Sequence, residues 1–328
     1  MTDQTKTLEL ELSGLKGDHP LGFLAACGVL RVMGPNSGVR LGWAETHGTW
    51  TAVLHDRAAT DATGAFRERI VDAVAQAATD VENLLKRFPG IGRTLSIEDY
   101  RKKGHWALTA ADEDATLGVA ITELLPSLGS DSLARDSKGA GPVHPSKMIM
   151  TSARQSLETT LKSFILPHIN KSRNNRKAER AVEKIENAIF GPWLYEDDAH
   201  SLGWDPTTQR LHALRNKAPA DDKQKRSVAA AVFLASQALP LFPCFAVGGW
   251  LHTTGFHHDN DGDWFSWPIW RAPISLDTLR TLVAQPFTRD LKERGVAVVY
   301  RCHRSRTGGD QGDYRVFGHP TKRPWPEM

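Results

Sequence analysis

The spacing of hydrophobic residues changes along the chain, and each spacing predicts a different element. Leucines alternate with charged residues over positions 8–12, which predicts a short β-strand. The apolar run after the next polar turn predicts a compact helix opened by Asp18 and Pro20, because an aspartate before a helix accepts its free N–H groups and proline is tolerated in the first turn. The segments VRLGW and TWTAVLH, joined by AETHG, then predict a hairpin.

One side of this first helix is nearly bare. Ala25, Ala26, Cys27 and Gly28 follow one another and carry few side-chain atoms. We therefore expect a strand or a nucleic-acid backbone to approach this side closely, so that it serves packing rather than catalysis. In such apolar surroundings Cys27 is expected to be an inert, buried thiol.

Helical spacing returns in the middle of the chain. Apolar residues recur every three or four positions over 63–88, and the segment FPGIG ends that helix. Two further helices are predicted at roughly 149–166 and 175–190, with Pro167 and a polar stretch between them. Another helix is predicted over 223–239.

The remaining segments have less regular patterns. Residues 95–126 are expected to be irregular or mixed, and the Gly-, Ser- and Pro-rich residues 127–146 predict a mobile loop or a domain boundary. Residues 242–270 are aromatic-rich with repeated Pro and Gly, which is typical of irregular chain or short strands. Ser275 is expected to cap a helix that runs to Val283, and the segments GVAVVYRCHRS and YRVF predict a terminal hairpin.

Together these elements predict an α/β fold of the α+β type. We expect a small N-terminal mixed sheet with helices, a helical middle, and a C-terminal β-containing part that ends in the hairpin. The corresponding segments are an N-terminal domain over 1–126, a loop with basic helices over 127–190, and a C-terminal region over 191–328.

The composition is that of an ordinary globular protein. The 328 residues are 40% hydrophobic and 24% charged, and the formal charge of +3 is too small to indicate nucleic acid without clustering. The three cysteines, Cys27, Cys244 and Cys302, are far apart, which excludes a disulfide framework or a CxxC zinc site and suits a reducing compartment. With no bilayer-length apolar run and no signal-peptide pattern, we expect a cytoplasmic protein.

Basic residues cluster in one predicted helical region. Between positions 162 and 187 there are seven Lys or Arg against three Glu, a local charge of +4. Several of these bases recur at spacings of three and four, so they share a helix face that can neutralise phosphates. The alternative is a solvated face in which Glu179 and Glu183 pair with neighbouring bases. The residues expected to contact phosphates are Lys171, Arg173, Arg176, Lys177 and Arg180.

The terminal hairpin carries a second basic group, formed by Arg301, Arg304 and Arg306. In a strand, Arg304 and Arg306 share one face while Arg301 and His303 share the other. A two-stranded ribbon with arginines can enter a nucleic-acid groove, so these three are also predicted phosphate contacts. The alternative is an edge hairpin kept soluble by its charges.

Three histidines and three aspartates fall within residues 252–263 and invite a metal-site interpretation. The segment lacks an HExxH motif and the register of an EF-hand, and NDGD is a strong turn signal, so a polar turn between two strands is the favoured interpretation. The alternative is a metal-dependent nuclease that uses His257, His258, Asp259, Asp261 or Asp263.

Other sequence signals of catalysis are missing. The chain has no GxSxG, no GxxxxGK[ST] and no GxGxxG motif, which argues against nucleophilic hydrolysis and against ATP or dinucleotide binding. We therefore expect no catalytic residues, no metal and no cofactor. The ten tryptophans are expected to fill the core more often than to stack on bases.

The opening GLKGDHPLGFLAACGVLRVM, followed by VRLGW and TW, resembles accessory proteins of type I CRISPR systems, particularly subtype I-G. Later segments are similar too, among them SLGWDP, LPLFP, TTGF and WPIW, so the resemblance covers most of the chain. These motifs are structural rather than catalytic. They do not distinguish between two kinds of CRISPR protein. One is a shortened form of the large subunit of the Cascade complex, and the other is the family of extension proteins encoded beside the CRISPR helicase–nuclease.

This resemblance implies a non-catalytic subunit of a crRNA-guided effector complex in antiviral defence. Such a subunit binds nucleic-acid backbone during recognition of double-stranded DNA, while the guide reads sequence by base pairing. The implied partners are crRNA or target DNA, other effector subunits and the helicase–nuclease, with no membrane. A pure protein–protein adaptor is the remaining alternative.

Overall fold

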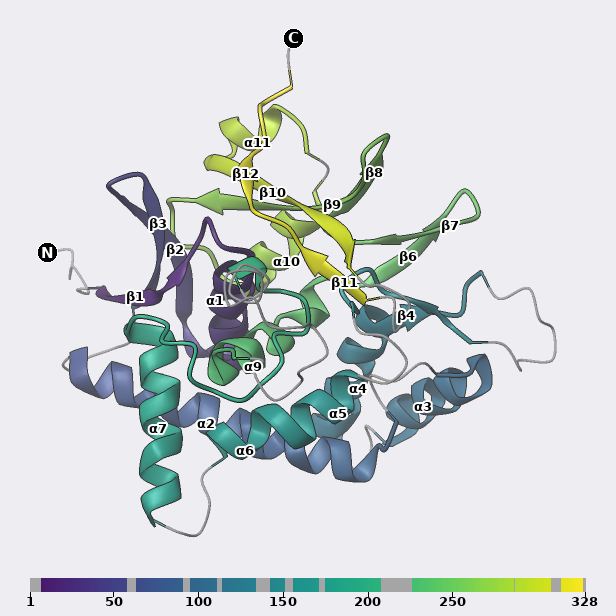
Figure 1. Ribbon diagram of the computed structural model, residues 1–328, viewed down its shortest axis with the longest axis horizontal. Helices are drawn as coiled ribbons and strands as arrows, with labels where there is room; N and C mark the ends of the chain where they lie inside the picture. Colours follow the sequence, from purple (N-terminus) through teal and green to yellow (C-terminus); the bar gives the residue numbers. More distant parts are fainter. Residues whose placement is uncertain are drawn as a thin grey trace, which may run out of the picture.

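We describe the protein from a computed structural model, which places residues 7–57, 63–90, 95–110, 114–133, 142–150, 156–170, 175–207, 226–285, 287–307 and 314–326. Helices and strands are mixed, with a small N-terminal sheet, a helical middle and a C-terminal sheet, so the predicted α+β class is confirmed (Figure 1). None of the described helices is both long enough and apolar enough to cross a bilayer.

The predicted N-terminal strand and hairpin are confirmed. Strands β1 (Leu8–Lys16), β2 (Val39–Thr46) and β3 (Thr49–Asp56) form an antiparallel sheet in the order β1-β3-β2. Helix α1 (Pro20–Met33) follows β1, but its N-cap is His19 and not Asp18. The extended backbone of His19 lets its Nδ1 accept the backbone N–H of Gly22 at 3.3 Å, and this satisfies one of the free donors at the helix start.

The bare side of α1 is covered by a helix, so the expectation of a strand or a nucleic-acid backbone there is wrong. Helix α9 (Ala229–Gln237) is rich in alanine and packs against α1. A Cβ atom placed on Gly28 would lie only 1.8 Å from the carbonyl oxygen of Leu234. Small residues on both helices allow this close approach, as in other tightly packed helix pairs. The Cys27 thiol is buried at this contact, and burial raises its pKa.

The predicted long helix is confirmed as α2 (Thr63–Arg87). The expectation of irregular structure over 95–126 is wrong, because α3 (Ile97–Ala110) and α4 (Ala115–Leu128) occupy most of it. The Asp114 side chain accepts the N–H of Leu117 at 3.1 Å and starts α4. Pro126 lies in the last turn of α4, where it interrupts little of the helix.

The next predicted helix begins later than expected and extends further. A continuous helical segment is formed by α5 (Leu157–Thr160), a π-helical stretch (Leu161–Ile165) and α6 (Leu166–Ile169). It passes through Pro167, which we expected to lie between helices. The wider π turn just before the proline accommodates its ring and its missing N–H. Helix α7 (Asn175–Phe190) is as predicted.

The C-terminal part contains the second sheet. Its strands run in the order β11-β10-β9-β8, and β12 also pairs with β10. The predicted terminal hairpin is confirmed, with Arg306 of β10 opposite Arg315 of β11. The strands are β8 (Phe256–Asp259), β9 (Gly262–Trp270), β10 (Val296–Thr307), β11 (Tyr314–Phe317) and β12 (Thr321–Lys322).

Smaller elements complete the described chain. Strands β6 (Cys244–Val247) and β7 (Trp250–Thr253) form a separate hairpin, and β4 (Gly129–Ser130) pairs with β5 (His144–Pro145). The Ser275 cap is confirmed: its Oγ accepts the N–H of Thr278 at the start of α10. The remaining short helices are α10 (Leu276–Ala284), α11 (Asp290–Glu293) and the 3-10 turns Pro35–Ser37 and Leu239–Leu241.

One hydrophobic core joins all three predicted segments, from Leu10 to Phe317. Five buried tryptophans belong to it, as expected, and three of them donate the indole N–H to a backbone carbonyl. Trp267 bonds Gly17 at 2.7 Å and Trp270 bonds Leu41 at 2.8 Å, so β9 is held against the N-terminal sheet. The third, Trp204, bonds Met148 at 3.0 Å.

Candidate nucleic-acid interface

The pairing of β8, β9, β10 and β12 gathers polar and aromatic side chains on one face of the C-terminal sheet. His303 lies opposite Trp264, which lies opposite His257 on β8. Arg301 lies opposite Ser266 on one side and Thr321 on the other. Because alternate residues of a strand share a face, these side chains emerge together with that of Arg323, just after β12. We call this the outer sheet face: His257, Trp264, Ser266, Arg301, His303 and Arg323.

Trp264 is the aromatic centre of the outer sheet face. The Arg301 guanidinium carbon lies 4.4 Å from the centre of its ring, a cation–π contact. His303 meets the same ring edge-on at 5.1 Å between centroids. The indole N–H donates to Asp259 at 2.9 Å, which fixes the ring orientation. The arginine is thus held over an aromatic ring, with its side chain ordered in advance.

Arg323 is the second arginine of this face. Its backbone N–H donates to the Val299 carbonyl at 2.7 Å, and its guanidinium carbon lies 3.9 Å from the centre of the Phe287 ring. Burial and the nearby charge of Arg301 lower the pKa of Arg323. Within the described ranges, neither Arg301 nor Arg323 has a carboxylate within 4.0 Å.

His257 lies within the same positive surroundings. Its Nδ1 is 3.4 Å from Ser266 Oγ, and its Nε2 is buried with no hydrogen-bond partner among the described residues. Burial, followed by the charges of Arg323, Arg301 and Lys147, lowers the pKa of His257 to about 4, although Asp259 acts in the opposite direction. His257 is therefore neutral at pH 7, and the positive charge of the face belongs to the arginines.

The opposite face of the sheet carries an ion-pair network centred on Asp263. Its carboxylate contacts Lys147 at 2.6 Å, His258 at 3.0 Å and Arg304 at 3.5 Å. Strand alternation predicts that Arg301 and Arg304 lie on different faces of β10, and the structure confirms this. The Arg304 side chain is only 15% exposed, so this predicted phosphate contact lies within an internal network. Arg306, two residues on, is exposed.

The five residues of the nuclease alternative are divided between the two faces. His257 and Asp259 lie toward the outer sheet face, whereas His258 and Asp263 belong to the opposite network. Asp261 lies in the turn, where its N–H donates to Asp259. Among the residues that the structure describes, no group of three or more His, Cys, Asp or Glu is arranged to hold a metal ion.

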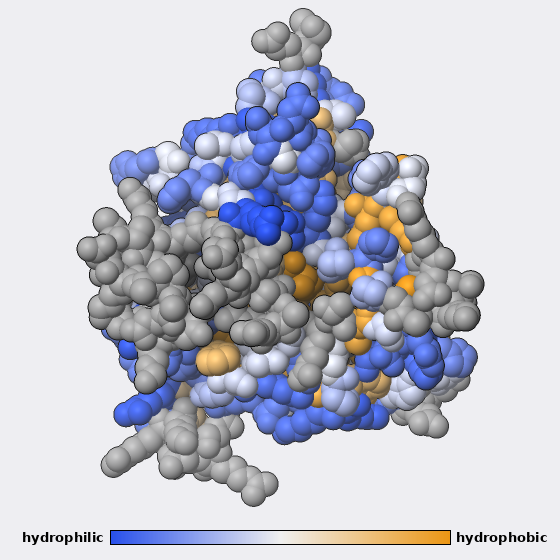
Figure 2. All heavy atoms as spheres, turned by 45° about the vertical axis from the view of Figure 1, so that its right-hand side comes forward, coloured by the Kyte–Doolittle hydropathy of each residue, from blue (hydrophilic) through white to orange (hydrophobic). Residues whose placement is uncertain are grey.

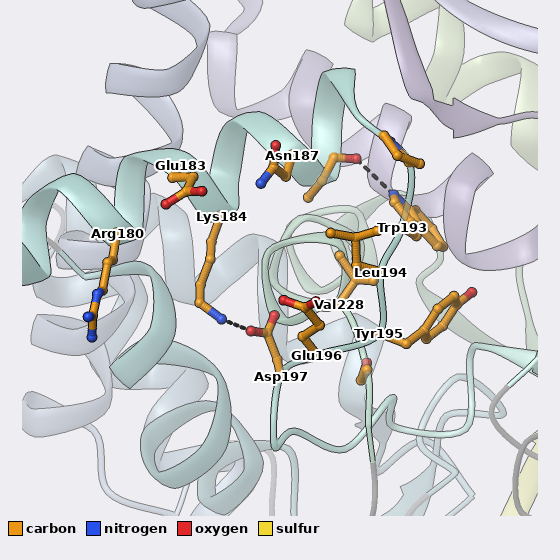
Figure 3. Close-up of a pocket in the computed structure, with 13 residues that line it drawn as sticks. Arg180, Glu183, Lys184, Asn187, Trp193, Leu194, Tyr195, Glu196, Asp197 and Val228 are labelled. Carbon is orange, nitrogen blue, oxygen red and sulfur yellow. Dashed lines mark hydrogen bonds and ion pairs between the residues drawn. The ribbon is translucent and has the colours of Figure 1, made fainter.

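The predicted basic helix is described only in part. Lys171 and Arg173 lie outside the described residues, as do the side chains of Arg176 and Lys177. Arg180 is exposed on α7 and lines a pocket of about 340 Å³ (Figure 3).

That pocket is mixed in charge. Lys184 forms an ion pair with Asp197, whose other oxygen accepts the Ala229 N–H at 2.8 Å at the start of α9. Burial lowers the pKa of Lys184. Glu183 and Glu196 also line the pocket, near Arg180 and Lys184 (Figure 3). Carboxylates therefore offset the bases here, and the pocket is a weaker phosphate site than the outer sheet face.

Sequence reasoning missed a polar cluster beside α1. His19 Nε2 lies 3.3 Å from Asp205 Oδ1 and 3.3 Å from Thr207 Oγ1, while its Nδ1 caps α1. Trp193 packs edge-on against the His19 ring at 5.4 Å. Both ring nitrogens are engaged, so this histidine joins two segments rather than acting as a free base. No motif links these residues, and His19 and Thr207 are 188 residues apart in the chain.

The β6–β7 hairpin lies within residues 242–270, for which the sequence predicted irregular chain or short strands. Gly248 and Gly249 have φ values of 59° and 82°, which form a tight turn between the strands. Trp250 is 76% exposed, Val247 55% and Phe245 48%. Figure 2 shows hydrophobic surface bordered by hydrophilic residues on the side of the molecule from which this hairpin projects. Its exposed tip is apolar and suited to contact with another molecule.

No protein-family model matches the sequence, and a search of curated proteins finds no match. The geometry of the outer sheet face is therefore the structural ground for a functional proposal.

Proposed function

We propose that this protein is a non-catalytic, nucleic-acid-binding subunit of a type I CRISPR effector complex, acting in the cytoplasm. Its partners are crRNA or target DNA, other effector subunits and the helicase–nuclease. The resemblance of the N-terminal segment suggests the system. The single observation that supports nucleic-acid binding is the outer sheet face. It combines a tryptophan–histidine pair with two arginines that have no carboxylate partner among the described residues.

The chemistry of that face suits a nucleic-acid backbone. Guanidinium groups bind phosphate oxygens through paired N–H donors, and release of counterions favours the complex. Unpaired bases stack on aromatic rings or on guanidinium planes. Arg301 provides such a plane, and it is already held over the Trp264 ring. Contacts of this kind are independent of sequence, as expected where a guide RNA reads the target.

Salt-dependent binding tests this proposal. We expect fluorescence anisotropy to detect binding of single-stranded RNA or DNA whose affinity falls steeply as the salt concentration rises. Arg301→Gln is expected to weaken binding alike for different sequences and to lower the salt slope by about one. The matched control is Arg271→Gln: Arg271 also stacks on a tryptophan, Trp50, but is paired with Glu45 at 2.7 Å.

The proposal of nucleic-acid binding is wrong if no binding is detected, alone or in a reconstituted complex, or if binding is independent of salt. The non-catalytic part has a separate test. Purified protein is incubated with DNA and RNA in Mg²⁺ or Mn²⁺, with EDTA controls. EDTA-sensitive cleavage that is lost in His257→Ala would identify a nuclease instead.

An adaptor function is a second candidate, favoured by the apolar tip of the β6–β7 hairpin. Tryptophan is prominent among residues that dominate protein–protein binding energies. We expect Trp250→Ser to reduce recovery of effector subunits in a nuclease-treated pull-down, whereas Leu108→Ser does not. Leu108 is a suitable control because it is 69% exposed on α3, away from the hairpin. Equal recovery with both variants would count against the hairpin as a docking site.

A further inference from the structure

Three side chains of the outer sheet face lie around Ser266. Arg301 is its cross-strand neighbour on β10. His257 Nδ1 lies 3.4 Å from Ser266 Oγ, and Arg323 Nη1 lies 3.5 Å from the same oxygen. These groups come from β8, β9, β10 and the segment after β12, so the sheet pairing alone brings them together.

In the described part of the chain, the two arginines at this point have no carboxylate in ion-pair contact. Arg301 and Arg323 lie close enough for the charge of Arg301 to lower the pKa of Arg323. The acidic group that acts on both is Asp259, but it is not within ion-pair distance of either in the described chain. Asp259 already accepts hydrogen bonds from the Trp264 indole and the Asp261 backbone. Two like charges are therefore kept near each other, and among the described residues neither has a carboxylate within ion-pair distance.

Two buried polar atoms at this point also need explanation. Arg301 Nε and His257 Nε2 are buried, and within the described chain neither has a hydrogen-bond partner. Buried polar groups in folded proteins are nearly always paired, so each such atom requires an explanation. A ligand that accepts hydrogen bonds from guanidinium groups and carries negative charge provides one.

We infer that Arg301, Arg323, Ser266 and His257 form a phosphate-binding site, in which one phosphate group bridges the two guanidiniums. The inference rests on the proposed function and names the chemical group bound there. A phosphate has several oxygens directed to different sides, so two guanidinium forks can each donate to it. The Ser266 hydroxyl, 3.5 Å from Arg323 Nη1, is a further donor. Neutral His257 contacts Ser266 and adds no third positive charge.

Such a phosphate has two sources in a nucleic acid: the end of a strand or an internal phosphodiester. Both present the same oxygens to the arginines. The Trp264 ring beneath Arg301 lies beside the site, so a base next to the bound phosphate meets an aromatic and guanidinium platform. The tests separate the two sources.

The first test uses inorganic phosphate and no nucleic acid. At matched ionic strength we expect phosphate, but not chloride, to raise the melting temperature of the wild-type protein. We also expect bound phosphate to raise the pKa of His257, measured by following its imidazole resonances in an NMR pH titration. A bound anion offsets the charges of Arg301, Arg323 and Lys147 and adds to that of Asp259. Arg301→Gln and Arg323→Gln are each expected to weaken phosphate binding by about tenfold, and Arg271→Gln to leave it unchanged.

The second test compares a 5′-phosphorylated oligonucleotide with its 5′-hydroxyl form. Tighter binding of the phosphorylated form assigns the site to a strand end, and equal affinity with dependence on both arginines assigns it to an internal phosphodiester. Either result supports the site. Arg301→Lys keeps the charge and the aliphatic stem, so a loss of binding in this variant reports on the guanidinium fork and not on folding.

The site is disproved if phosphate affects neither the melting temperature nor the His257 resonances of the wild-type protein. It is also disproved if Arg301→Gln and Arg323→Gln weaken phosphate binding no more than Arg271→Gln. If the protein binds phosphate but no nucleic acid, the proposed function is wrong and the phosphate-binding site stands. If it binds nucleic acid in a salt-dependent way but does not bind inorganic phosphate, the proposed function stands and the phosphate-binding site is wrong.

Discussion

Gly28 of α1 lies directly against the backbone of Leu234 in α9, so closely that a Cβ atom at position 28 would be 1.8 Å from the Leu234 carbonyl oxygen. A backbone neighbour cannot turn away as a side chain can. The contact therefore sets the distance between the two central buried helices and requires glycine.

We accordingly expect Gly28→Ala to lower the free energy of unfolding by at least about 3 kcal/mol, at the upper end for overpacking. Gly104→Ala is the control, because Gly104 lies within α3 and its nearest neighbour would be 4.0 Å from the new Cβ. Alanine there is expected to stabilise the protein by up to about 1 kcal/mol. Urea denaturation measures both, and equal stabilities would contradict the packing described.

Asp263→Asn tests the ion-pair network centred on Asp263, on the face of the sheet opposite the outer sheet face. The wild-type carboxylate has three basic neighbours, Lys147, His258 and Arg304. Burial by itself raises the pKa of Asp263, but hydrogen bonds from Lys147 and His258 and the nearby charges lower it overall. We expect the variant to lose about 1–3 kcal/mol of stability, since two half-buried cations lose their counter-charge.

The pH dependence gives that prediction a second measurement. A carboxyl group whose pKa is lower in the folded state stabilises the protein above its unfolded value near 3.8, and this contribution is lost as the pH falls further. The difference in the free energy of unfolding between the wild-type protein and Asp263→Asn should therefore become smaller below pH 4. Asp277→Asn serves as control because Asp277 is mostly exposed. A variant as stable as this control would show that the network contributes nothing.

His257→Gln tests the neutral histidine. Because the folded pKa is about 4 and the ordinary value is 6.5, the unfolded chain takes up the proton first as the pH falls. Folding is therefore weakened between pH 6.5 and pH 4. We expect the free energy of unfolding of the wild-type protein to fall by about 1 kcal/mol from pH 7 to pH 5 through this histidine, after allowing for partial exposure of its side chain. Chemical denaturation across this range should show a flatter pH profile for the variant; parallel profiles would refute the assignment.

Substitution of two tryptophans, Trp250 and Trp204, should change the stability of the protein by very different amounts. Trp250 is 76% exposed, so Trp250→Ala is expected to change stability by less than about 0.5 kcal/mol. Trp204 is buried and its indole N–H bonds the Met148 carbonyl, so Trp204→Ala is expected to lose about 3–5 kcal/mol. Thermal denaturation distinguishes them. A large loss in Trp250→Ala would mean that the β6–β7 hairpin is part of the fold and not a free surface.

Local pattern was enough for much of the fold. The alternation at 8–12 predicted β1, the helical spacing over 63–88 predicted α2, and Ser275 marked the start of α10. These features depend on hydrogen bonds and side-chain contacts within a few residues, which the sequence itself contains. The same reasoning failed at α3 and α4, where packing stabilises helices whose own pattern is weak.

The candidate site was predictable only along single strands. Alternation placed Arg301 and Arg304 on opposite faces of β10, but gave no sign that Arg304 faces Asp263 and Lys147. The five residues from Lys171 to Arg180 remain predictions, since only the Arg180 side chain is described.

What the sequence determined by itself is the set of elements and the face on which each strand residue lies, because both follow from the period of the backbone. The tertiary structure decided which faces meet. It set Gly28 against Leu234, and it brought Arg323 beside Arg301 through the pairing of β12 with β10. Such contacts join residues far apart in the chain, and their geometry depends on how the whole core packs, which no local spacing records.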